Sequence, residues 1–271
     1  MRASLSSILF FVVGETIATV HLCGDSTMAR GNGVIDGWGQ YLQYSLDTPV
    51  VNHAIGGRSA RSYTREGRFD EVLNVVQSGD WVVIEFGHND GGSLSNDNGR
   101  SDCFGDGEET CQTTYNGVAE TVHTFPWYLK QASTKFLSKG AKVILSEATP
   151  NNPWEGGSFA WGPSRFFYYT WLAAAQLGGP DKGVYFVPHG QYTAQMMKNA
   201  GASVVNAGFP QDHTHTSPAM ADMVSQSFVL GVACGTSDLA GSVKNSTADL
   251  TKGVLGNCIT EYNSTVIDLL R

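Results

Sequence analysis

The stretch Thr19-Val20-His21-Leu22-Cys23-Gly24-Asp25-Ser26 decides the fold that we expect. Its first five residues form an apolar, partly β-branched run that is typical of a buried strand. The strand ends at Gly24, which leaves Ser26 at the start of the segment that follows. We therefore expect Ser26 at the carboxyl end of a strand, the edge where parallel sheets gather their functional groups.

Four further short runs share these features and end in polar or glycine-rich sequence. Together with the first run they predict strands at residues 19–23, 50–53, 81–86, 142–146 and 184–187. Longer patterns predict helices at residues 38–46, 68–77, 118–138, 166–177, 192–199 and 218–233. This alternation indicates an α/β fold with a parallel sheet of about five strands, covered by helices on both faces. Residues 91–114 are expected to form a long surface loop.

The length of 271 residues fits one large domain, and 41% hydrophobic with 15% charged residues excludes a disordered chain. The net charge of −8 argues against nucleic acid or an anionic membrane as the main partner. No cofactor-binding motif stands out, and we expect a monomer.

The first 18 residues resemble an export signal. Arg2 precedes an apolar run at residues 5–13, and the small residue Ala18 suits cleavage. The run is too short to span a bilayer. We therefore expect a signal peptide at residues 1–18, a single catalytic domain at residues 19–271, and a secreted protein.

Cysteine usage agrees with an extracellular location. Cys23 lies in the first predicted strand, whereas the other four cysteines lie in loop-rich sequence and allow three disulfide connectivities. We favour Cys103–Cys111 and Cys234–Cys258, which close a short loop and tie down the C-terminal segment. Asn245 and Asn263 begin glycosylation sequons.

A distant segment, Asp212-His213-Thr214-His215, can complete a nucleophilic site with Ser26. Hydroxyl nucleophiles need an imidazole base within hydrogen-bond reach and an acid on the other ring nitrogen. We assign Ser26 as nucleophile, His215 as base and Asp212 as the orienting acid. Alternatively, Ser26 is only a helix cap, His213 is the base, or the His-x-His pair binds metal.

Two loops after predicted strands offer donors for an oxyanion. Gly57 supplies a backbone N–H and Asn89 a side-chain amide, and the N–H of Ser26 is a third donor. The alternative is that both loops are ordinary turns, a common use of paired glycines and of asparagine.

Recognition of an anionic polymer is a second hypothesis. Arg58, Arg61, Arg65 and Arg68 lie within eleven residues, and guanidinium groups bind carboxylates well. Salt bridges to nearby acidic residues are the alternative. Trp154 follows the fourth predicted strand and either stacks on a sugar ring or packs under a loop.

Gly24-Asp25-Ser26, Gly57, Gly87-His88-Asn89 and Asp212-x-x-His215 resemble the four blocks of the SGNH (GDSL-type) hydrolases. Longer stretches are similar to one branch, the fungal rhamnogalacturonan acetylesterases. They include residues 57–69, Glu85-Phe86-Gly87-His88-Asn89-Asp90-Gly91-Gly92-Ser93, Thr149-Pro150-Asn151-Asn152-Pro153-Trp154 and residues 212–218. The resemblance extends from about residue 19 to residue 258.

This resemblance implies a three-layer α/β/α, flavodoxin-like fold, no metal or other cofactor, and removal of acetyl groups from the rhamnogalacturonan backbone of pectin. It also implies the triad Ser26, Asp212 and His215, and an oxyanion hole formed by Ser26, Gly57 and Asn89. The two favoured disulfide pairings follow the same pattern. The chain departs from the branch in the extra glycine Gly56 and in a longer spacing between Cys234 and Cys258.

Three other functions compete with this hypothesis. They are an esterase acting on acetylxylan or acetylated homogalacturonan, a GDSL lipase or thioesterase of broad acyl range, and a non-catalytic carbohydrate-binding protein. The complete set of five candidate catalytic residues argues against the last.

Overall fold

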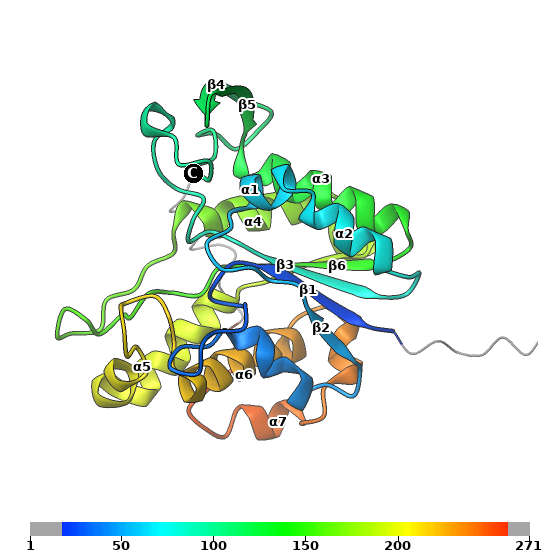
Figure 1. The fold of residues 1–271 in the computed structure, drawn as a ribbon. Helices are drawn as coiled ribbons and strands as arrows, with labels where there is room; N and C mark the ends of the chain where they lie inside the picture. Colours follow the sequence, from blue (N-terminus) through cyan, green and yellow to red (C-terminus); the bar gives the residue numbers. More distant parts are fainter. Residues whose placement is uncertain (1–17, 260–271) are drawn as a thin grey trace, which may run out of the picture.

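The computed structural model describes residues 18–259, which form three layers (Figure 1). The middle layer is a parallel sheet with strand order β2-β1-β3-β6-β7. Its strands are β1 (Val20–Gly24), β2 (Val50–Asn52), β3 (Trp81–Glu85), β6 (Lys142–Ser146) and β7 (Val184–Val187). The five predicted strands and the three-layer α/β/α class are thereby confirmed.

Helices cover both faces of the sheet (Figure 1). One face carries α1 (Ala60–Arg65), α2 (Arg68–Val75), α3 (Phe125–Ser138) and α4 (Arg165–Gln176). The other carries α5 (His189–Ala207), α6 (Pro218–Cys234) and the short α7 (Thr247–Leu250). No helix in the described range is long and apolar enough to cross a membrane.

Two hydrophobic cores follow from the alternation of side chains along each strand. In β1, Val20 and Leu22 lie in the core shared with α5 and α6, whereas Cys23 lies in the core shared with α1 to α4. In β6, Ile144 joins the first core, and its neighbours Val143 and Leu145 join the second. Strands buried on both faces therefore appear in the sequence as continuous apolar runs.

The predicted helix at residues 118–138 is wrong over its first part. Residues Thr110–Tyr115 and Val118–His123 form β4 and β5, an antiparallel hairpin that projects beyond the helical layer (Figure 1). Its turn is Asn116-Gly117, with φ of 52° and 78°, the left-handed conformation that two-residue hairpin turns require. The helix begins after Thr124, whose hydroxyl accepts from the N–H of Trp127.

Other boundaries also differ from the predictions. The predicted helix at residues 38–46 is a pair of 3₁₀ helices, Trp38–Gln40 and Leu42–Tyr44, and the helix at 192–199 is part of the longer α5. Helix α1 was not predicted, because its six residues span less than two turns. The expected loop at 91–114 contains the 3₁₀ helix Leu94–Asn96 and most of β4.

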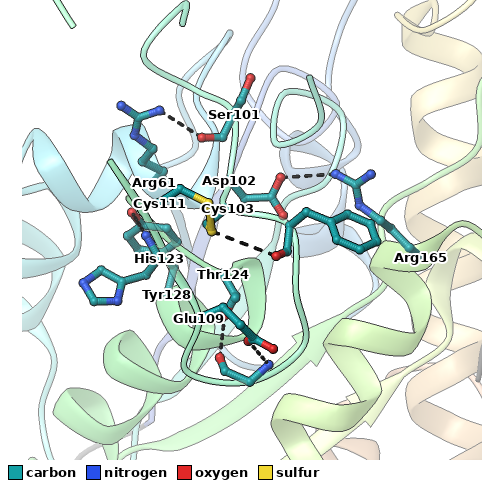
Figure 2. The surroundings of a disulfide bond; sticks show 12 residues. Arg61, Ser101, Asp102, Cys103, Glu109, Cys111, His123, Thr124, Tyr128 and Arg165 are labelled. Carbon is teal, nitrogen blue, oxygen red and sulfur yellow. Dashed lines mark hydrogen bonds and ion pairs between the residues drawn. A yellow bond between two sulfur atoms is a disulfide. The ribbon is translucent and has the colours of Figure 1, made fainter. Parts of the chain in front are cut away.

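Both favoured disulfides are present. Cys103 is joined to Cys111 and Cys234 to Cys258, with Cα–Cα distances of 5.4 and 5.5 Å. The first connects the loop before β4 to the hairpin (Figure 2), and the N–H of Cys103 donates to the His123 carbonyl. Cys23 is a buried free thiol.

Of the predicted signal peptide and the two predicted glycosylation sites, only part lies within the described residues. Asn245 is exposed, whereas Asn263 and residues 1–17 of the predicted signal peptide lie outside the described residues. Glycosylation at either asparagine stays a prediction.

A buried carboxylate joins the sheet to the helical layer of α5 and α6. Glu85, at the end of β3, is 1% exposed and accepts hydrogen bonds from three side chains. Trp38 Nε1 lies 2.8 Å from Oε1, His189 Nδ1 lies 2.8 Å from Oε2, and the Ser146 hydroxyl donates to Oε2. The other ring nitrogen of His189 faces the Val224 carbonyl at 2.9 Å. This network joins β3, β6, α5 and α6.

Replacing Glu85 with alanine should strongly destabilise the fold, because it leaves three buried polar groups without their acceptor. Removal of one partner from such a network costs about 3–5 kcal/mol. Denaturant unfolding measures the loss, with Glu71→Ala as a control, since Glu71 is a surface carboxylate 63% exposed. Equal effects of the two changes would contradict a structural role for Glu85.

Candidate active site

Three side chains from distant parts of the chain meet at the carboxyl edge of the sheet. His215 Nε2 lies 2.9 Å from Ser26 Oγ, and His215 Nδ1 lies 2.7 Å from Asp212 Oδ2. Because an ionised carboxylate only accepts, Nδ1 carries the proton toward Asp212, and Nε2 is left to accept from the Ser26 hydroxyl. The three side chains that the sequence singled out are therefore in serial hydrogen-bond contact.

The electrostatics of Asp212 suit an orienting acid. Burial alone would raise its pKa, but hydrogen bonds from the His215 ring and from the backbone N–H groups of His215 and Thr214 outweigh burial and lower the pKa to about 2. Asp212 therefore stays ionised near neutral pH. Asp212 Oδ1 accepts from the backbone N–H groups of Thr214 and His215 and so holds the turn, while Oδ2 orients the His215 imidazole.

His213, the alternative base, points elsewhere. Its Nδ1 lies 3.6 Å from a carboxylate oxygen of Glu155, and both side chains are more than half exposed. In the described residues, no group of three or more His, Cys, Asp or Glu side chains is placed to hold a metal ion.

The candidate oxyanion donors lie on the loops after β1, β2 and β3. A Cβ on Gly56 would lie 3.6 Å from the Ser26 Cβ, so this loop passes close beside Ser26. Gly57 has φ of 75°, which favours glycine. Asn89 donates from Nδ2 to the Arg58 carbonyl at 3.1 Å and accepts at Oδ1 from Arg100 Nη1 at 3.0 Å. Both ends of the Asn89 amide are thereby held.

The burial of three carboxyl groups beside these loops was not predicted from the sequence. Asp25, Asp90 and Asp102 each have one oxygen, Oδ2, without a hydrogen-bond partner in the described part of the chain. Burial raises the pKa of Asp25, raises that of Asp90 well above its usual range, and raises that of Asp102 to about 6. The Asp90 carboxyl accepts from the N–H of Ala60 at 2.7 Å and so connects the Asn89 loop to α1.

The predicted substrate contact of Arg61 is wrong, whereas those of Arg58 and Arg65 stay predictions. Arg61 is 1% exposed and forms ion pairs with Asp97 at 2.8 Å and Glu120 at 2.7 Å, so it cannot reach a polymer. The salt-bridge alternative also describes the other members of the cluster. These ion pairs are Arg58–Glu66, Arg65–Glu120, Arg68–Glu66 and Arg68–Glu71.

Trp154 also follows its packing alternative. Its indole N–H donates to the Met197 carbonyl at 2.9 Å, and its ring contacts Phe159 edge-on and the core beside α5. The ring is therefore a support for its own loop rather than an open stacking surface.

Two cavities border the candidate site. One, of about 230 Å³, is lined by Ser26, His215 and Gly56 together with Ala29, Arg30, Gly31, Asn32, Ile35 and Asp36. The other, of about 450 Å³, lies between the loops after β3 and β6, and its lining includes His88, Asn151 and Trp161. The cavity at Ser26 is smaller than the usual 300–1,000 Å³ of ligand pockets, which suits a small acyl group.

A Ser–His–Asp array at the edge of an α/β/α sheet is typical of serine hydrolases. The family model for the GDSL-like lipase/acylhydrolase family matches residues 22–223. The chain therefore belongs to this family.

Individual relatives agree with the family match. A rhamnogalacturonan acetylesterase of Emericella nidulans is 56% identical over 216 residues, which cover 80% of this chain and 85% of that protein. A probable rhamnogalacturonan acetylesterase of Bacillus subtilis, YesY, is 30% identical over 144 residues, covering 52% and 58%. The crystal structure of Bacillus subtilis YxiM matches with a TM-score of 0.60 at 20% identity, over 80% of this chain and 56% of that chain, a similarity of fold.

We expect Asp90→Asn to gain stability relative to the wild type as the pH rises. Because the pKa of Asp90 is raised in the folded state, the folded protein keeps this proton at a pH where the unfolded chain releases it. The wild type therefore has the full stabilisation from this proton at low pH and loses it as the pH rises toward the folded-state pKa. Asparagine has no such dependence. Thermal unfolding at about pH 4 and about pH 7 measures the difference. A difference between the two proteins that does not change with pH would contradict the assignment.

Proposed function

We propose that this protein is a secreted serine esterase that hydrolyses acetyl esters on the rhamnogalacturonan backbone of pectin. The observation that carries the proposal is the serial contact of Ser26, His215 and Asp212. The 56% identity to an enzyme named for this reaction supports the substrate. The two disulfides support an oxidising location.

The proposed reaction proceeds through an acetyl-enzyme. Ser26 Oγ attacks the acetyl carbonyl while His215 Nε2 takes the hydroxyl proton, and Asp212 stabilises the resulting imidazolium. The tetrahedral oxyanion is held by the N–H groups of Ser26 and Gly57 and by the Asn89 amide. His215 then gives its proton to the leaving sugar oxygen. A water activated by His215 hydrolyses the acetyl-enzyme and frees acetate.

The small cavity at Ser26 favours an acetyl ester over the esters of a broad lipase or thioesterase. Other acetylated polysaccharides, such as acetylxylan, are the remaining alternative for the same chemistry. We further propose that residues 19–271 act as one catalytic domain and that the protein acts as a monomer without a cofactor.

Ser26→Ala should abolish release of acetate from acetylated rhamnogalacturonan, because no other hydroxyl is in contact with His215 in the described residues. Acetate release by wild type and variant measures this, with acetylxylan as comparison substrate and thermal unfolding as the control for folding. Turnover that survives in a folded variant would overturn the mechanism, and release from acetylxylan alone would overturn the substrate.

Asn89→Ala should lower kcat by about 10²–10³-fold, the scale for losing one oxyanion donor. Because the amide stabilises charge that develops only in the transition state, KM should change little. Initial rates over a range of substrate concentrations separate the two constants. A near-normal kcat would exclude Asn89 from the oxyanion hole.

A further inference from the structure

The arginines of this acidic protein divide into two groups. In residues 18–259, five arginines form ion pairs with carboxylates, namely Arg58, Arg61, Arg65, Arg68 and Arg165. Two in the same range have no carboxylate within 4.0 Å, namely Arg30 and Arg100. Both of these lie at the candidate active site.

Arg100 lies against the oxyanion donors. Its Nη1 donates to Asn89 Oδ1 at 3.0 Å and lies 3.9 Å from the place of a Cβ on Gly57. The side chain is partly buried, and this one contact leaves most of its five N–H donors available.

Arg30 borders the cavity that Ser26 and His215 line. Its side chain is exposed, and its Nε donates to the neutral Gln40 amide oxygen at 3.1 Å. Asp36 lines the same cavity, but its carboxylate is occupied by the N–H groups of Gly31 and Gly37 and by the Tyr41 hydroxyl.

Two of the paired arginines, Arg61 and Arg65, hold the loop that carries Arg100. Arg61 donates to the Ser101 carbonyl, a contact drawn in Figure 2, and is paired with Asp97 on the other side of Arg100. Arg65 donates to the Gly99 carbonyl at 2.8 Å. Two members of the cluster that the sequence suggested for substrate binding, Arg61 and Arg65, therefore hold this loop, and Arg100 is the guanidinium that the loop presents to the site.

A net charge of −8 opposes the approach of a polyanion, so local positive charge at the site has to offset that repulsion. Guanidinium groups bind carboxylates in two-point, charge-assisted contacts. We propose that Arg30 and Arg100 bind uronate carboxylates of the polymer close to the acetyl ester and so select an anionic polysaccharide. This inference rests on the proposed function and names the residues that recognise the substrate of the proposed esterase.

The test compares three esters: acetylated rhamnogalacturonan, the neutral polymer acetylxylan, and a small neutral aryl acetate. Arg30→Gln and Arg100→Gln remove charge at the site, and Arg100→Lys restores the charge without the planar fork. Arg68→Gln is the matched control, since it removes the same charge from a surface ion pair. The value compared is the ratio of kcat/KM for the pectic polymer to kcat/KM for the aryl acetate.

We expect this ratio to fall about tenfold in Arg30→Gln and Arg100→Gln, mainly through KM, the scale of one lost charge-assisted hydrogen bond. Arg100→Lys should recover part of the loss, and Arg68→Gln should keep the wild-type ratio. Added salt should reduce the advantage of the wild type over the two glutamine variants on the pectic polymer, because it screens the local attraction that the variants lack.

Three outcomes would overturn the inference. An unchanged ratio in Arg30→Gln and Arg100→Gln would show that neither arginine binds a carboxylate of the polymer. Equal losses on the aryl acetate would show that Arg100 acts through Asn89 and not on the substrate. A matching loss in Arg68→Gln would point to overall charge. Failure of the proposed function is separate, because the wild type itself would then release no acetate from the pectic polymer.

Discussion

The parallel pairing of β1 with β3 is the constraint on which the site depends. It places Gly24 opposite Glu85, so that Ser26 and the His88-Asn89 loop leave the sheet side by side. The approach is close, since a Cβ on Gly24 would lie 2.8 Å from the Glu85 carbonyl oxygen. Below this point the Glu85 carboxylate joins the sheet to the layer of α5 and α6, and above it Ser26 lies close beside the loop that carries Gly56 and Gly57.

His215, the candidate base, lies on a loop that hydrogen bonds hold from two sides. Thr216 exchanges hydrogen bonds with Asp36, which follows β1, and the His213 carbonyl accepts from the N–H of Asn152, which follows β6. These contacts hold an exposed segment at a fixed distance from Ser26. The geometry of the triad therefore does not depend on burial of Asp212, which is 44% exposed.

Much of the fold could be predicted because buried parallel strands leave continuous apolar runs. The same reasoning failed at residues 118–123, where a helical period was assumed although Asn116-Gly117 is a strong hairpin signal. The contacts of Ser26 with His215 and of His215 with Asp212 could be predicted because a serine at a strand end and a distant Asp-x-x-His pair are what a nucleophilic hydroxyl site needs. Neither the burial of Arg61 nor the position of Arg100 was predictable, since both depend on a loop whose course is set by the hairpin, Asp97 and the Cys103–Cys111 disulfide.

The buried carboxyl groups show a related limit of the sequence. The local sequence does not show that Asp25, Asp90 and Asp102 are buried, because burial is a property of the assembled loops. Burial raises the pKa of Asp90 well above its usual range and so favours the neutral acid there, while the hydrogen bonds to Asp212 keep that residue ionised. At one edge of the sheet, the pKa of one aspartate, Asp90, is raised while that of another, Asp212, is lowered.

The central claim is that Ser26 is the nucleophile. Labelling with an organophosphonate, followed by peptide mass spectrometry, tests it most directly, because such reagents trap an activated serine. We predict one adduct on the peptide that contains Ser26, and protection from labelling by acetylated rhamnogalacturonan. An adduct on another residue, or an unlabelled Ser26 in protein that still releases acetate, would contradict the claim.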